Sequence, residues 1–158
     1  LESGFVGTWV REGAEAAIGV DVDEARARFA SARVARLATR NAAGDSDLVP
    51  ITFAVRDDGA IVTAVDHKPK RTERLQRLAN VRAYPAVTLL VDHYDDDWTS
   101  LWWVRVRGRA SIIEPDDPAH TAAVGALVDK YAQYRDRPPA GAAIVVEVTE
   151  ITGWAAAG

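Results

Sequence analysis

The sequence contains no cysteine and no methionine. Because cysteine is absent, the chain has no disulfide framework, no zinc–thiolate site and no thiol nucleophile. No apolar run approaches the ~20 residues that a membrane-spanning helix needs, and residues 1–20 lack the basic-then-apolar order of a signal peptide. We therefore expect a cytoplasmic chain with no membrane partner.

Several catalytic motifs are missing as well. The sequence has no HExxH metal site, no glycine-rich phosphate loop and no serine–histidine–aspartate arrangement, so it gives little support to hydrolysis or nucleotide-triphosphate chemistry. Its 158 residues have a formal net charge of -4, with 48% hydrophobic and 27% charged residues. This composition is typical of one globular domain, which we place at residues 21–158, after an N-terminal tail or extension at 1–20.

The hydrophobic pattern predicts mostly strands, with three inserted helices. The helices are expected at about 23–32, after Pro69 and over 116–134, where apolar residues recur at helical spacing. The strands are expected at 33–39, 48–55, 60–66, 86–94, 98–113 and 143–154. Asp58-Gly59 is a strong hairpin signal, because glycine accepts the positive φ of a tight turn. We therefore expect a mainly β (α+β) fold, an antiparallel barrel of about six strands rather than a doubly wound sheet.

Positive charge gathers in one short stretch of this acidic chain. The segment VDHKPKRTERLQRLANV, residues 65–81, places Lys68, Lys70 and Arg71 between a predicted strand and a predicted helix. Two ammonium groups, a guanidinium, the Thr72 hydroxyl and free N–H groups at a helix start are how proteins hold a phosphate. A solvated helix face is the alternative interpretation. Duplex nucleic acid would need a broader basic surface, so we expect no nucleic-acid partner.

The strand at 98–113 carries two further features. Trp102 and Trp103 are adjacent and therefore face opposite sides, so one enters the core while the other packs on a second subunit or covers a ligand. Arginines 105, 107 and 109 alternate with apolar residues and are expected to face outward, with a break or bulge at Gly108.

His93 lies close to several aspartates in VDHYDDDW. Histidine and carboxylates together are possible ligands of a cation, but consecutive acids in a turn usually only solvate it. A hydrogen-bonded structural role is the other interpretation, and we assign no metal to the chain.

Three stretches, taken together, resemble the pyridoxamine-5'-phosphate-oxidase-like (PPOX class) FMN-binding split-barrel family. They are LVPITF, TAVDHKPKRTERLQRLANVRAYPAVTLLVDHYDDDW and WWVRVRG, within a similarity that covers roughly residues 23–154. Their order and spacing are similar to those of the actinobacterial branch that depends on the deazaflavin coenzyme F420. The resemblance implies an antiparallel six-stranded split barrel that forms a homodimer, with the cofactor in a groove between the two barrels.

The resemblance also implies ten cofactor-binding residues. The cofactor phosphate would be held by Lys70 and Arg71, with the assistance of Lys68 and Thr72 and with His67 at the border of the loop. The ring system and ribityl chain would lie against Val49, Pro50, Ile51, Thr63 and Trp103. No residue is assigned a catalytic role.

By this resemblance, the chain would be an F420-dependent oxidoreductase, a probable reductase that passes hydride to an unidentified small molecule. FMN is the alternative cofactor, because both cofactors present a phosphate to the same loop. F420 carries an additional acidic tail, which positive charge at Arg74, Arg77 or Arg105 would favour. A non-catalytic protein that carries a flavin, F420 or a tetrapyrrole-like ligand is the third possibility.

Overall fold

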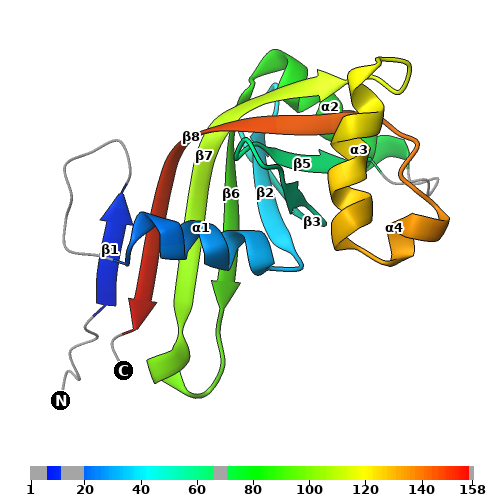
Figure 1. Cartoon of the computed structure of the whole chain (residues 1–158). Coiled ribbons are helices and arrows are strands. Elements are labelled where there is room, and N and C mark those ends of the chain that lie inside the picture. Colours follow the sequence, from blue (N-terminus) through cyan, green and yellow to red (C-terminus); the bar gives the residue numbers. More distant parts are fainter. Residues whose placement is uncertain (1–6, 12–19, 66–70, 157–158) are drawn as a thin grey trace.

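A computed structural model describes residues 7–11, 20–65 and 71–156 (Figure 1). The first half of the chain forms β1 (Gly7–Arg11), α1 (Val22–Ser31), β2 (Ala35–Arg40), β3 (Ser46–Ile51), β4 (Ala54–Val55), β5 (Ile61–Ala64) and α2 (Arg71–Ala83). The second half forms β6 (Ala86–His93), the 3-10 helix η1 (Trp98–Ser100), β7 (Trp102–Ile113), α3 (Ala119–Lys130), α4 (Gln133–Asp136) and β8 (Ala143–Ala156).

All of these strands join one antiparallel sheet, in the order β3-β2-β6-β7-β8-β5-β4, with β1 paired to β8 as well. The long β8 pairs with β7 along its length, while its other edge pairs first with β5 and then with β1. The two end strands, β3 and β4, are separated in the chain only by Thr52 and Phe53. The sheet therefore curls back on itself into a barrel that is split between β3 and β4.

The expected antiparallel split barrel is confirmed, and two features raise the number of strands from six to eight. The stretch 48–55 was expected as one strand, but it breaks at Thr52–Phe53, because the chain crosses here from one end of the sheet to the other. The second addition is β1, which lies within the segment 1–20 that we expected as a tail.

The helices begin and end close to their expected positions, with one exception. Asp21 caps α1 through its carboxylate, which accepts a hydrogen bond from the Asp23 N–H at 3.1 Å. The helix expected over 116–134 instead ends at Lys130, and α4 follows separately. Tyr131 interrupts it in an extended conformation (φ -114°, ψ 117°), since its hydroxyl group is held by Phe53 on the barrel.

The core fills the inside of the barrel. Helix α1 crosses β7 and β8 in Figure 1 and inserts Phe29, whose ring lies 4.9 Å from that of Phe53. A second buried cluster joins α3 to β5 through Leu127, Tyr131 and Val62. The expected bulge at Gly108 is confirmed by a shift in the β7–β8 register, and a Cβ at this position would collide with the Glu147 carbonyl oxygen.

Candidate functional site

Two recesses have Leu48 of β3 in their walls. The tryptophan recess is on the outer face of the sheet, has a volume of about 430 Å³, and its walls include Arg36, Leu48, Leu90, Tyr94, Trp103 and Arg105. The α2 recess has a similar volume of about 430 Å³, and its walls include Thr39, Asp47, Leu48, Val49, Gln76 and Asn80. Both volumes lie in the range of small-molecule sites, and the two recesses meet at Leu48.

Strand alternation and register create the tryptophan recess. Leu90 lies between two buried residues of β6, so its side chain takes the outer face of the sheet. It is the pairing partner of Arg36 on β2 and of Arg105 on β7. Trp103, two residues before Arg105, shares the same face. The result is an aromatic and aliphatic surface flanked by two guanidinium groups.

The two arginines of the tryptophan recess differ in how their charge is compensated. Arg36 Nη1 lies 2.8 Å from Asp92 Oδ1. The Arg105 guanidinium lies 5.6 Å from the centre of the Trp103 ring, which is a cation–π distance. Among the described residues, no carboxylate forms an ion pair with Arg105. The recess is therefore suited to a flat ligand that carries negative charge.

A polar network joins α2 to the strands at the α2 recess. The Asn80 side chain, 2% exposed, donates from Nδ2 to Thr39 Oγ1 at 3.0 Å and to Asp47 Oδ2 at 2.7 Å. Its Oδ1 accepts a hydrogen bond from Gln76 Nε2 at 2.7 Å. Asn41 Nδ2 donates to the other Asp47 oxygen at 3.2 Å. These bonds fix the position of α2, and with it the place where the helix begins, at Arg71.

The strand residues predicted to bind a cofactor are only partly brought together. Val49 lines the α2 recess, and Pro50 is exposed beside it on the unpaired edge of β3, whereas the Ile51 side chain is buried in the core. Thr63 lies on β5, is buried, and its hydroxyl donates to the Thr52 carbonyl oxygen at 2.8 Å. Thr63 lines neither recess.

The predicted phosphate-binding residues lie largely outside the part of the chain that the structure describes. This holds for His67, Lys68 and Lys70, and for the side chains of Arg71 and Thr72. The backbone of α2 is described from Arg71 onward. The first N–H groups of a helix have no intrahelical acceptor, so the start of α2 offers free donors of the type that bind anions. The assignment of individual residues to the phosphate stays a prediction.

Trp102 and Trp103 do face opposite sides of β7, as predicted. Trp102 packs against the core, and the Arg28 guanidinium lies 5.3 Å from the centre of its ring. Trp103 lines the tryptophan recess instead. The His93 ring stacks on Trp102 at 6.5 Å, and its Nε2 lies 2.9 Å from Asp95 Oδ2, which supports a structural role for this histidine.

Sequence reasoning missed the apolar wall of the tryptophan recess. Leu48 is 69% exposed and Tyr94 is 64% exposed, although both are large apolar residues. One signal was present, because the run Leu89–Leu90–Val91 does not alternate with polar residues, and strands covered on both faces have such continuous runs. Exposed apolar surface of this kind is typical of an interface.

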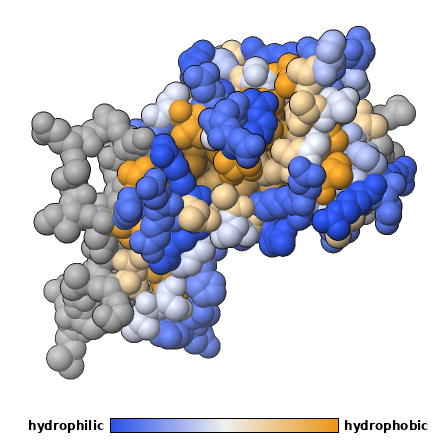
Figure 2. Space-filling view, in the orientation of Figure 1, coloured by the Kyte–Doolittle hydropathy of each residue, from blue (hydrophilic) through white to orange (hydrophobic). Residues whose placement is uncertain are grey.

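A third recess, of about 1090 Å³, is larger but holds none of the predicted site residues. It opens between α1 and the β4–β5 hairpin, where Figure 2 shows hydrophobic side chains at the base of a hollow and hydrophilic ones at its rim. Its lining includes Arg26, Arg56 and Arg109 as well as Asp57 and Glu147. Because both signs of charge are present, the recess favours neither an anionic nor a cationic ligand. The two smaller recesses are therefore the better candidate.

No three His, Asp or Glu side chains in the part of the chain that the structure describes are grouped so that they could hold a metal ion. Of the described helices, none has both the length and the apolar character needed to span a bilayer.

Solved structures share this fold. A conserved hypothetical protein from Mycobacterium tuberculosis is 20% identical, with a TM-score of 0.69 over 86% of this chain and 85% of that chain. An FAD-binding protein from Mesorhizobium loti is 19% identical, with a TM-score of 0.65 over 85% and 94% of the two chains. A heme binding protein from Mycobacterium smegmatis is 22% identical, with a TM-score of 0.62 over 80% of this chain and 50% of that chain.

No curated protein matches the chain. The model of one protein family does match, over residues 22–155, and its description is pyridoxamine 5'-phosphate oxidase. This match covers far more than half of the sequence and runs from the start of α1 to the penultimate residue of β8. The chain therefore belongs to the pyridoxamine 5'-phosphate oxidase family.

Proposed function

We propose that this protein is an oxidoreductase that binds coenzyme F420 in the groove formed by the tryptophan recess and the α2 recess. The main support is that the aromatic wall of Trp103 and the Arg105 guanidinium, which forms no ion pair among the described residues, share one open recess. A deazaflavin or flavin ring is flat and apolar, and its side chain is anionic, so its parts match these features. The ring would supply hydride chemistry when bound.

Residues of this chain would bind and orient such a ring. Trp103 and Leu90 offer an apolar wall, and Leu48 separates the ring position from the α2 recess. The start of α2 would meet the phosphate through its backbone N–H groups and through Lys70 and Arg71. Since Asn80 ties α2 to both β2 and β3, the two ends of the groove stay in register.

We further propose that two copies of the chain pair through this outer face as a homodimer. Leu48 and Tyr94 are each more than half exposed in the single chain, and a second barrel placed here would remove both from water while excluding water from the groove. Leu48→Asp should then shift the protein from dimer to monomer in light scattering after size exclusion. A wild-type monomer at micromolar concentration would contradict the dimer.

The choice of F420 as the cofactor is supported by the resemblance of the 65–81 segment to the actinobacterial F420 branch. FMN in the same groove is the alternative, and the FAD-binding protein from Mesorhizobium loti supports a flavin. A carrier without turnover is a second candidate, and the heme binding protein from Mycobacterium smegmatis has the same fold. The small-molecule substrate would lie on the open face of the ring.

A titration with F420 and, separately, with FMN tests the cofactor. Micromolar or tighter binding of F420 with weaker binding of FMN would support the proposal, whereas the reverse order would assign FMN. If the protein bound neither cofactor, the assignment of this site would be wrong.

Trp103→Leu should weaken cofactor binding about 3- to 10-fold, which is the scale of an aromatic stacking contact. Trp98→Leu is the matched control, because Trp98 lines neither recess. Turnover with a chemical reductant and an unsaturated acceptor distinguishes an enzyme from a carrier.

A further inference from the structure

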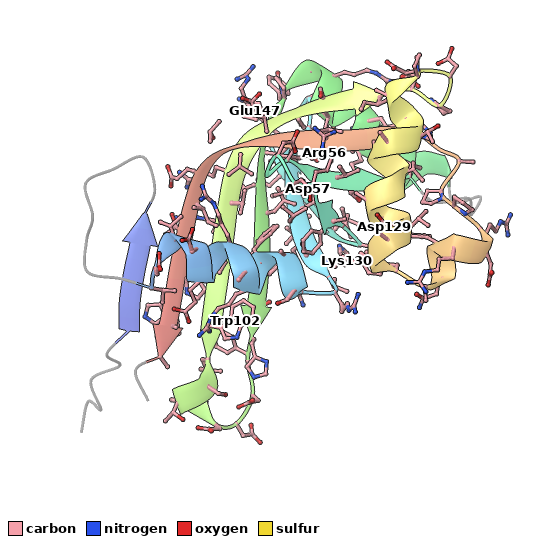
Figure 3. The ribbon with its side chains drawn as sticks, in the orientation of Figure 1. Arg56, Asp57, Trp102, Asp129, Lys130 and Glu147 are labelled. Carbon is pink, nitrogen blue, oxygen red and sulfur yellow. The ribbon has the colours of Figure 1, made fainter. Side chains whose placement is uncertain are left out.

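Lys130 is one of only three lysines in the sequence, and it lies away from the other two, Lys68 and Lys70, in the chain. It is the last residue of α3, and its ammonium group reaches across to the barrel (Figure 3). Nζ donates to the Ala32 carbonyl oxygen at 2.6 Å and lies 3.9 Å from the centre of the Phe53 ring. The amine is thus held against an aromatic face.

Burial and the charge of Arg33 disfavour the protonated form of Lys130, whereas the Ala32 carbonyl oxygen and the face of the Phe53 ring favour it. Among the described residues, no carboxylate lies within ion-pair distance of Nζ, and Arg33 Nη1 donates to the Lys130 carbonyl oxygen at 3.0 Å. Burial, and then the charge of Arg33, lower the pKa of Lys130 to about 8. The neighbouring phenol of Tyr131 keeps its proton, since burial raises its pKa.

A groove of about 730 Å³ has Lys130 in its wall. It lies between the end of α1, the β4–β5 hairpin and α3, and small residues such as Ala30, Ala122 and Gly125 leave it open beside Lys130. The other charged groups that line it are Arg56, Asp57, Asp58 and Asp129. Figure 3 shows Lys130 and Asp129 on the α3 side and Arg56 and Asp57 on the hairpin side.

We propose that Lys130 is a nucleophilic amine that small acyl donors with a good leaving group, such as acyl phosphates and thioesters, modify in this groove. The lone pair of neutral Nζ attacks the carbonyl carbon, and a C–N bond forms. The bond from that carbon to the phosphate oxygen or thiolate sulfur breaks, and the leaving group keeps the electron pair. Nitrogen loses a proton to water, so the product is an amide and no redox partner is needed.

The expected rate follows from the neutral fraction. At pH 7.5 about a quarter of Lys130 is neutral, against about 0.1% of an ordinary lysine with a pKa of about 10.4. Lower basicity also reduces intrinsic nucleophilicity, with a Brønsted slope of about 0.4–0.5 in the analogous thiol case. The net advantage is roughly tenfold.

Acetyl phosphate is the probe, and peptide mass spectrometry of the full chain gives the rate at Lys130 between pH 6.5 and 10. Nα-acetyl-lysine amide in the same reaction is the ordinary amine. We expect roughly tenfold faster acetylation of Lys130 at pH 7.5, and a pH profile with its midpoint near 8. A rate no faster than the reference, or a midpoint above pH 10, would overturn the proposal.

Two controls test whether fast labelling of Lys130 depends on the folded structure or only on the general reactivity of acetyl phosphate with amines. Lys130→Arg should remove the fast-labelled peptide without changing the other labelled positions. Unfolding the wild-type chain in guanidinium should abolish the advantage of Lys130 over the reference amine, since the cause is burial against Phe53. An advantage that survives unfolding would contradict the proposal. Neither outcome depends on the cofactor that the protein binds.

Discussion

The hydroxyl group of Tyr131 lies within hydrogen-bond distance of both backbone polar groups of Phe53, 3.1 Å from its nitrogen and 2.9 Å from its carbonyl oxygen. Phe53 is buried between the two end strands of the sheet, where neither group has a strand partner. One side chain from the end of α3 therefore satisfies the backbone at the split of the barrel. The same hydroxyl also lies 2.9 Å from the Arg33 carbonyl oxygen.

Tyr131→Phe should destabilise the protein by about 1–3 kcal/mol, because it leaves the buried Phe53 N–H without an acceptor. Urea unfolding measures the change. Tyr134→Phe is the matched control: its hydroxyl pairs with Thr52 Oγ1 at 2.8 Å in a less buried setting, so we expect a loss below about 1 kcal/mol. Equal losses in the two variants would show that the Tyr131 hydroxyl has no special role at the split.

Two glycines should respond to alanine with opposite signs. At Gly108, a Cβ would collide with the Glu147 carbonyl oxygen, so Gly108→Ala should lose about 1–3 kcal/mol of unfolding free energy through strain in the bulge. At Gly125, within α3, a Cβ would meet nothing within 4 Å, so Gly125→Ala should gain about 0.5–1 kcal/mol from helix propensity. Thermal melts of both variants test the pair, and a stable Gly108→Ala protein would mean that the bulge can shift.

The barrel itself could be predicted because each strand carries local signals. Alternation along β7, the bulge at Gly108 and the Asp58-Gly59 turn depend on neighbouring residues, and the structure contains all three. The break at Thr52–Phe53 could not be predicted in this way, because it depends on where the two ends of the sheet meet. At that point Phe53 is hydrogen-bonded to Tyr131, 78 residues further along the chain.

The candidate site was predictable only in part, for a similar reason. The opposite faces of Trp102 and Trp103 follow from strand geometry alone. The placement of Leu90 between Arg36 and Arg105 depends on the registers of two strand pairs, which no short motif encodes. The role of Asn80 could not be predicted either, because its hydrogen-bond partners, Thr39 and Asp47, lie on β2 and β3, far from it in the sequence.

Asn80→Ala should destabilise the protein by about 1–3 kcal/mol, because Thr39 and Asp47 both lose a donor in a buried setting. Gln76→Ala is the control, since Gln76 is exposed and its side chain donates a hydrogen bond to Asn80 Oδ1, and this variant should lose less than about 1 kcal/mol of unfolding free energy. Urea midpoints measure both. If Asn80→Ala matched the control, the network would not be what holds α2 on the barrel.

The stability of the folded chain should rise between about pH 8 and pH 10 because of Lys130. Its pKa is about 8 in the folded chain, below the value of about 10.4 expected when unfolded, so the unfolded chain binds more protons between these two values. Unfolding free energy then increases with pH. Below pH 8 both states carry the proton, and the penalty for burying the charge is present in full.

The comparison that isolates this effect is wild type against Lys130→Met, with urea unfolding measured from pH 7 to pH 10. The unfolding free energy of the wild type should rise relative to that of the methionine variant as the pH increases from about 8 to 10. Tyr131, whose pKa is raised by burial, produces the opposite slope above about pH 10, but it is present in both proteins and cancels. Two parallel curves would mean that Lys130 titrates in the folded chain as it does in water.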